Sequence, residues 1–202
     1  MRRLLLTLAV LLGAAPALRP ALAQPSLTPK RDYAATYRME GMGPVGGTAM
    51  SIAYSAALKM QRMEGGPMGG VMLLNPTTGT LTMLQPELRS YMELTGGRAD
   101  QAPWLDSNRY RFERTGSDRV ANTPCTVWKM MEGTTQRGTV CATDDGIMLR
   151  AEFDHDGNHG KIEATSFALA TQPPENFRVP AGYSKMEMPG MPPGMGRPPR
   201  RQ

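Results

Sequence analysis

The sequence predicts a mainly β fold, built from one long run of antiparallel strands. Apolar and polar residues alternate with a period of two from Tyr33 to about Ala170, which is the pattern of half-buried strands. Short clusters of Gly, Pro, Asn and Asp separate the alternating stretches, and helical periodicity is hard to find. The spacing predicts about ten or eleven strands and one or two short helices. A sheet of this size buries one of its faces by curling or closing.

The first half of the chain predicts a meander. Tyr33, Ala35, Tyr37 and Met39 alternate on one face of the first strand, and a glycine-rich loop follows at 41–47. Residues 48–94 then read as strands joined by short connections. The turns are expected in the Gly- and Pro-rich segments 65–70, 75–79 and 85–87.

The second half predicts a longer loop and further hairpins. Residues 95–108 are expected to form the loop, with a short helix near 102–105. A turn is expected at 116–118, followed by a strand over 120–131, where Pro124 predicts a bulge or an edge. Asp-Gly pairs at 145–146 and 156–157 predict two tight hairpins. Between these hairpins Ile147, Leu149, Ala151 and Phe153 are expected to face inward, and residues 161–170 form the last long strand.

Both ends of the chain differ in composition from its middle. Residues 1–23 combine Arg2 and Arg3, an apolar run and Ala21-Leu22-Ala23, which predicts a Sec-type signal peptide cleaved after Ala23. We therefore expect a soluble periplasmic or secreted protein with a folded domain at 24–185. Residues 186–202 are rich in Met, Pro, Gly and Arg and are expected to be a disordered tail.

Charge argues against nucleic acid as a partner. The net charge of +5 comes from the two ends, because residues 24–185 hold 17 Lys and Arg against 17 Asp and Glu. No basic domain is left to contact a phosphate backbone. Nor does any stretch of the sequence predict a transmembrane segment.

Cys125 and Cys141 are the only cysteines. An even pair in an exported protein predicts a structural disulfide, and redox chemistry would favour a closer spacing such as C-x-x-C. The residues between the two cysteines hold their own turn, so the bridge is expected to join neighbouring strands.

Three segments resemble a known family. Gln172–Met188 reads Q-P-P-E-N-F-R-V-P-A-G-Y-S-K-M-E-M, Gln85–Met92 forms a strand with Pro and Tyr-Met, and Asp145–Arg150 reads D-G-I-M-L-R after the cysteine-bracketed hairpin. They resemble a bacterial exported family of unknown function related to the lipoprotein-carrier-like superfamily (LolA, LolB and LppX type). The resemblance implies a strongly curved half-barrel whose apolar concave face is plugged by a helix or two. In the lipid-handling members that face holds acyl chains.

The apolar alternating positions supply the candidate ligand-binding face, for which the alternative is a plain core. The protein is thus expected to be a binding protein that holds a lipid, an acyl chain or a partner segment. A structural or envelope-stress module without a ligand is another alternative. The candidate residues are Tyr33, Tyr37, Met50, Ile52, Leu58, Met60, Leu81, Met83 and Tyr91.

Metal binding and catalysis find less support in the sequence. His155 and His159 lie in an Asp/Asn/Gly turn that a solvated hairpin explains well. Thioethers select Cu(I), so a copper-related protein that uses tail methionines is an alternative, although no cofactor is expected otherwise. No catalytic motif is found, so we expect no enzyme and name no catalytic residue. The tail methionines are Met186, Met188, Met191 and Met195.

Overall fold

The computed structural model describes residues 24–41, 48–66, 69–95, 110–155 and 158–186. These residues form a single 12-stranded sheet in the order β12-β6-β5-β4-β3-β2-β1-β11-β10-β9-β8-β7. Two 3-10 helices, η1 (Pro86–Leu88) and η4 (Pro174–Phe177), are the helical elements of the described part. The strands are β1 (Tyr33–Glu40), β2 (Thr48–Ser55), β3 (Met60–Gly65), β4 (Val71–Asn75), β5 (Thr80–Gln85), β6 (Ser90–Thr95), β7 (Arg111–Val120), β8 (Thr123–Glu132), β9 (Thr135–Ala142), β10 (Met148–His155), β11 (Asn158–Ala168) and β12 (Ser184–Lys185).

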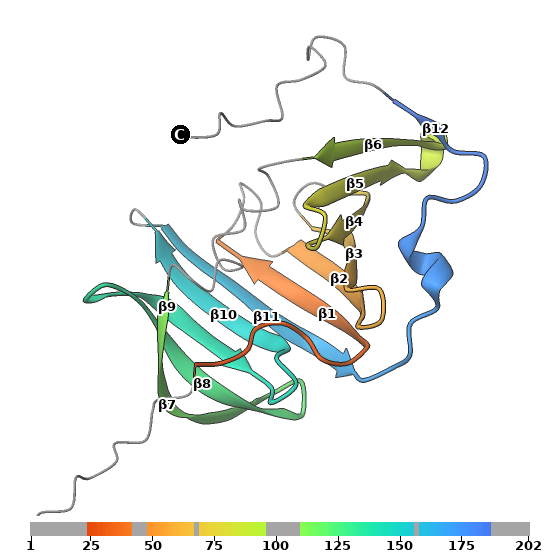
Figure 1. Ribbon diagram of the computed structural model, residues 1–202. Coiled ribbons are helices and arrows are strands. Elements are labelled where there is room, and N and C mark those ends of the chain that lie inside the picture. The colour runs from red at the N-terminus through yellow and green to blue at the C-terminus, as the bar shows by residue number, and fades with distance from the viewer. Residues whose placement is uncertain (1–23, 42–47, 67–68, 96–109, 156–157, 187–202) are drawn as a thin grey trace, which may run out of the picture.

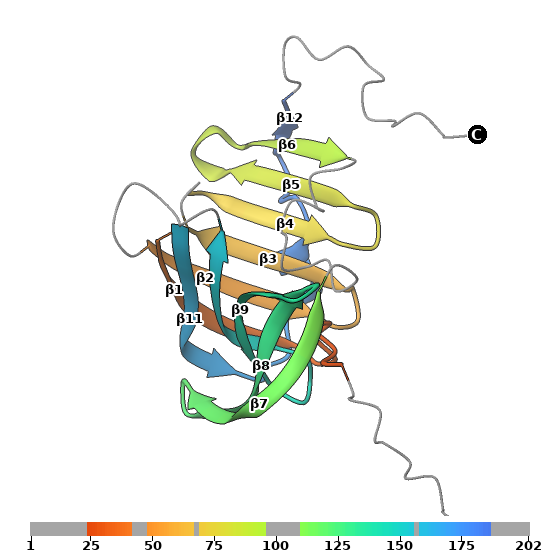
Figure 2. The same ribbon diagram turned by 90° about the vertical axis from the view of Figure 1, so that its left-hand side faces the viewer.

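The predicted fold class is confirmed. Neighbouring strands pair antiparallel, except that β12 runs parallel to β6. The predicted meander is β2 to β6, whose strands are neighbours in chain order. Figures 1 and 2 show that the sheet is open and curved, and in the view of Figure 2 β7–β9 lie in front of β1 and β2. The helix expected near 102–105, the signal peptide at 1–23 and all of the predicted tail 186–202 except Met186 lie outside the described residues.

The core fills the curl of the sheet. Ile147 and Leu149 are fully buried, and Tyr37 is 2% exposed. One contiguous cluster joins side chains of β1 and β2 with side chains of β7 to β11, and Phe112 and Met130 belong to it. Ile147, Leu149, Ala151 and Phe153 all pack into this cluster, as their alternation predicts. The described residues contain no helix long and apolar enough to cross a membrane.

The prediction of a turn at 116–118 is wrong. β7 runs through these residues, and Gly116 lies where its register with β8 shifts by one residue. The chain turns instead at Ala121 and Asn122, which have φ values of 46° and 61°. Asparagine tolerates this left-handed conformation better than most residues, and glycine in a strand often marks a bulge.

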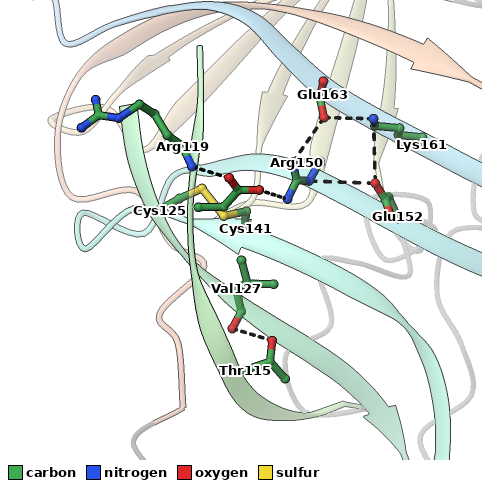
Figure 3. A network of polar contacts seen from close by, with 10 residues as sticks. Thr115, Arg119, Cys125, Val127, Cys141, Arg150, Glu152, Lys161 and Glu163 are labelled. Carbon is green, nitrogen blue, oxygen red and sulfur yellow. Dashed lines mark hydrogen bonds and ion pairs between the residues drawn. A yellow bond between two sulfur atoms is a disulfide. The ribbon is translucent and has the colours of Figure 1, made fainter. Parts of the chain in front are cut away.

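A disulfide and an ion pair cross-link four neighbouring strands. Cys125 and Cys141 join β8 to β9 with a Cα–Cα distance of 5.4 Å, which confirms the predicted bridge. Asp118 is the β7 partner of Cys125, and Arg150 is the β10 partner of Cys141. The Arg150 guanidinium donates to Asp118 Oδ2 at 2.6 Å, so the ion pair joins β7 to β10 beside the disulfide (Figure 3). This hydrogen bond lowers the pKa of Asp118.

The same face carries more charges. Arg150 also lies 3.6 Å from Glu163 and 3.9 Å from Glu152, and Lys161 lies 3.0 Å from Glu163. Figure 3 shows these side chains bridging β10 and β11. Partly exposed pairs of this kind contribute little each, but these side chains all have partners of opposite charge within the group.

The C-terminal segment 169–186, called the strap here, covers the other half of the sheet. It leaves β11, runs along β3 to β6 and adds β12 to the β6 edge (Figure 1). Asp32 accepts from the Gln172 backbone N–H at 2.9 Å, and Arg62 donates to the Asn176 carbonyl at 3.0 Å. Phe177 is 3% exposed, so the strap is a packed part of the fold.

Gln24 occupies the outer edge at β7. Its amide donates to the Phe112 carbonyl at 3.1 Å and accepts from the Phe112 N–H at 2.8 Å. One side chain thus takes the hydrogen bonds of a strand neighbour at this point of the β7 edge.

The disulfide predicts a redox-dependent stability. We expect the double variant Cys125→Ala/Cys141→Ala to lose about 3 kcal/mol of unfolding free energy under oxidising conditions. The measurement is urea unfolding of both proteins, with and without reduction in the unfolded state. If the variant lost the same unfolding free energy relative to the wild type under reducing conditions, that result would contradict a stabilising bridge.

The strap predicts a second stability effect. Phe177→Ala removes its buried anchor and should cost about 3 kcal/mol or more. During limited proteolysis we expect this variant to be cleaved first within 169–186. Mass spectrometry of the fragments identifies the cleavage site. Leu88→Ala is the matched control, because Leu88 is 69% exposed, and it should leave stability and cleavage unchanged. Equal cleavage in both variants would show that the strap is not held by Phe177.

Candidate functional site

The face of the sheet that carries the core side chains of β2 extends past the core cluster onto β3 to β6. Ile52 and Tyr54 of β2 are buried in the core cluster, and they pair with Met63 and Gln61 of β3. Cross-strand partners lie on the same face of a sheet, so this face extends over β3 to β6. The core cluster reaches the extension only at Met63, among the described residues.

Two rows of apolar side chains cover this extension, and together they are called the apolar wall. The first is the leucine row of Leu74, Leu81 and Leu94, which are direct cross-strand partners in β4, β5 and β6. The second is the methionine row, one residue from each of β3 to β6. Met72 and Leu74 are 5% and 9% exposed, and the other members are half-buried. The methionine row is Met63, Met72, Met83 and Met92, each paired with the next.

The opposite face of the same strands belongs to the strap. Arg62, Leu73 and Thr82 are cross-strand partners on that face. Leu73 is 2% exposed and Leu84 is 3% exposed, and the bond from Arg62 to the strap lies on this side. The strap and the apolar wall therefore lie on opposite faces of β3 to β6.

Three predicted site residues lie in the plain core instead of the wall. Tyr33 stacks on Tyr54 with ring centroids 5.9 Å apart, and Tyr37 donates its hydroxyl to the Met148 carbonyl at 2.8 Å. Burial raises the pKa of Tyr33 and of Tyr37, which keeps both phenols protonated. Ile52 is 8% exposed in the same cluster. These residues hold the sheet together and belong to the core cluster.

Six further predicted residues divide among three places. Leu81 and Met83 lie in the wall, and Met50 is half-buried on the same face. Leu58 lies in the β2–β3 turn and is 37% exposed. Met60 and Tyr91 pair with Ser55 and Leu84 on the strap side.

The placement of Leu58, Met60 and Tyr91 on the predicted face is therefore wrong. The phase of the alternation restarts after each turn, and a shift of one residue moves a whole strand to the other face.

The sequence reasoning missed most of the wall. Met63, Met72 and Met92 were not among the predicted site residues, and neither were Leu74 and Leu94. The available signal was the spacing of the methionines, since Met63, Met72, Met83 and Met92 recur once per strand of the predicted meander. Correct hairpin registers would have placed them in one row.

Other candidate positions give no site among the described residues. His159 Nδ1 lies 2.9 Å from Asp154 Oδ1 on the surface, while the His155 side chain lies outside the described part. Met186 is half-buried and its backbone N–H donates to Tyr91; Met188, Met191 and Met195 lie outside it. No group of three His, Cys, Asp or Glu residues able to hold a metal occurs among the described residues.

Two open hollows lie away from the wall. One, of about 310 Å³, is lined by small side chains of β11, β1 and β2 beside Arg62 and Glu64. The other, of about 280 Å³, lies between the β7–β8 hairpin and Leu169. The Arg62–Glu64 pair in the first is already satisfied at 2.6 Å, so this pair leaves no uncompensated charge for a ligand.

Solved structures are similar to this chain, and the first one described here, with a TM-score above 0.5, supports the fold. An uncharacterized conserved protein from Thermus thermophilus is 12% identical with a TM-score of 0.54, over 78% of this chain and 90% of that one. The Pseudomonas aeruginosa MucA/MucB complex matches at 13% identity and a TM-score of 0.49, over 76% of this chain. This chain spans 57% of the length of that matched chain. A LolA superfamily protein from Nitrosomonas europaea matches at 10% identity and a TM-score of 0.39, over 74% and 91% of the two chains.

Such likenesses concern the fold and leave activity open. No curated protein matches the sequence. A family model does match: residues 39–156, more than half of the chain, fit the family described as Domain of unknown function (DUF4412). The predicted membership of a family of unknown function is confirmed, and this chain belongs to the DUF4412 family.

Proposed function

We propose that the protein is an exported, soluble binding protein that holds an apolar ligand, a lipid or acyl chain, against the apolar wall. The observation that carries the proposal is the wall itself, two uninterrupted apolar rows that lie beside the core cluster. Its residues belong to one face of four neighbouring strands, so they form a surface long enough to follow an extended chain. The strap lies on the opposite face and does not compete for the wall.

The side chains of the wall suit a ligand of variable shape. Methionine is unbranched and polarisable, and it adapts to irregular apolar surfaces. The four side chains of the methionine row can therefore adjust to the shape of a ligand, whereas the leucine row beside them is stiffer. Binding sites for apolar ligands combine such surfaces with a few polar groups.

Ser90 supplies a polar group at the end of the wall. It pairs with Gln85 and, two positions from Met92 along β6, shares the face of Met92. Ser90 is 5% exposed, and its hydroxyl has no hydrogen-bond partner among the described residues. Because buried hydroxyls are normally paired, this one is available to a polar end of the ligand.

Export is supported from two sides. The predicted signal peptide would leave Gln24 as the first residue, and Gln24 is the residue that bonds to Phe112 at the β7 edge. The disulfide is the form that cysteines take in an oxidising compartment. We therefore place the mature domain, 24–185, in the periplasm or outside the cell, followed by the tail.

The function is tested by binding of a fluorescent fatty acid, dansyl-labelled undecanoic acid, to the purified mature protein. We expect saturable binding that Met83→Gln weakens by about tenfold, because an unpaired amide against an alkyl chain costs about 1–3 kcal/mol. Leu58→Gln is the matched control, since Leu58 lies in an exposed turn, and it should bind as the wild type does.

Two outcomes would overturn the proposal. One is the absence of saturable binding together with no lipid in native mass spectra of the extracted protein, which favours a module without a ligand. The other is unchanged affinity in Met83→Gln when thermal melts show that the variant is folded. A peptide in place of lipid in those spectra would favour a partner segment.

A further inference from the structure

The two rows of the wall differ in chemistry although they share one environment. They lie on the same face of the same strands, one alternation step apart. One row is entirely methionine over four strands, and the neighbouring row is leucine over three. A need for apolar surface alone does not explain why one row is methionine and the other leucine, because either residue fits a half-buried apolar position. Strand propensity gives no reason for methionine, since β-branched and aromatic residues are favoured there.

The methionine row brings thioethers together in space. Met63 pairs with Met72, Met72 with Met83, and Met83 with Met92. Direct partners on neighbouring antiparallel strands have Cα atoms about 4.5–5.5 Å apart. A methionine side chain has three rotatable bonds, so the sulfurs of Met63 and Met83 can both approach that of Met72. Met72 is the most buried of these three and occupies the centre.

More sulfur lies beside the row. A Cβ atom placed on Gly66 would lie 3.5 Å from the Met50 sulfur and 3.5 Å from the Met39 methyl carbon. The ends of these two side chains therefore both lie next to Gly66. Met50 pairs with Gly65 in β3, on the face of Met63.

Competing ligands are scarce at this place. Both cysteines of the chain are in the disulfide, so no thiolate is available. The described residues hold no cluster of three His, Cys, Asp or Glu. Hard cations need oxygen ligands, whereas soft thioethers favour Cu(I). The chemistry of the row thus selects one class of ion.

We propose that the methionine row is a binding site for a soft monovalent metal ion, Cu(I) or its analogue Ag(I), centred on Met72 with Met63 and Met83. The site uses folded strands and does not need the tail methionines Met188, Met191 and Met195. It goes beyond the proposed lipid binding, because it requires thioether sulfur, whereas a lipid requires only apolar surface.

The test is a titration of the mature protein with Ag(I) in chloride-free buffer, followed by native mass spectrometry. Cu(I) is then titrated without oxygen against the chelator bathocuproine disulfonate. We expect one tightly bound ion in the wild type. Met72→Leu/Met83→Leu should lose this ion or bind it at least about tenfold more weakly, because it keeps the apolar volume and removes two sulfurs.

Two controls make the test specific. Met130→Leu/Met148→Leu also removes two sulfurs, from β8 and β10, and should bind as the wild type does. A chain ending at residue 186 lacks the tail methionines Met188, Met191 and Met195 and should keep the ion. Single Met83→Leu serves if the double variant fails to fold, since Met83 is only half-buried.

Three results would overturn the site: no bound ion in the wild type, equal binding in Met72→Leu/Met83→Leu, or loss of the ion on removing the tail. The lipid proposal is judged separately in the same proteins. Leucine preserves an apolar wall, so Met72→Leu/Met83→Leu should still bind the dansyl fatty acid. Loss of metal with retained fatty acid separates the two activities.

Discussion

The antiparallel register of β2 to β6 is the constraint on which both surfaces of this half of the protein depend. Paired residues on neighbouring strands lie on the same face of the sheet, as Ile52, Met63 and Met72 do. The intervening residues, such as Leu73, go to the other face and lie under the strap. A slip of one residue in any hairpin would exchange the two sets. The same turns therefore decide which side chains form the apolar wall and which side chains lie on the face covered by the strap.

The other half of the sheet depends on a different device. There the strands curl, and cross-links on one face hold the curl in place. The disulfide joins the inner pair of strands, β8 and β9, and the Asp118–Arg150 ion pair joins the flanking pair, β7 and β10. The covalent link sets the spacing of β8 and β9, and the charges tie their neighbours. The curled half is thereby cross-linked, whereas the wall lies on strands that backbone pairing and the strap hold.

Much of the fold was predictable because alternation within a strand is a local property. Tyr33 to Met39 and Ile147 to Phe153 were placed on the correct faces, and the disulfide and the meander were predicted. The phase between strands is not local: it depends on how many residues each turn uses. For that reason Met60 and Tyr91 were assigned to the wrong face, and most of the methionine row was missed. Gly116 misled in a related way, because a strand bulge and a turn have similar composition.

The pairing of β1 with β11 has a consequence for how the chain folds. β1 begins at Tyr33, and its partner β11 ends at Ala168, so a pair of strands in the interior of the sheet joins residues from opposite ends of the domain. The core needs both strands, since Tyr37 and Ile162 belong to the same cluster. Contacts this distant close late and slow the folding reaction. The core therefore cannot be completed until nearly the whole domain has been synthesised. For the exported protein proposed above, such a topology would delay the core until after passage through the membrane, and the disulfide between β8 and β9 would then link two strands of the completed core.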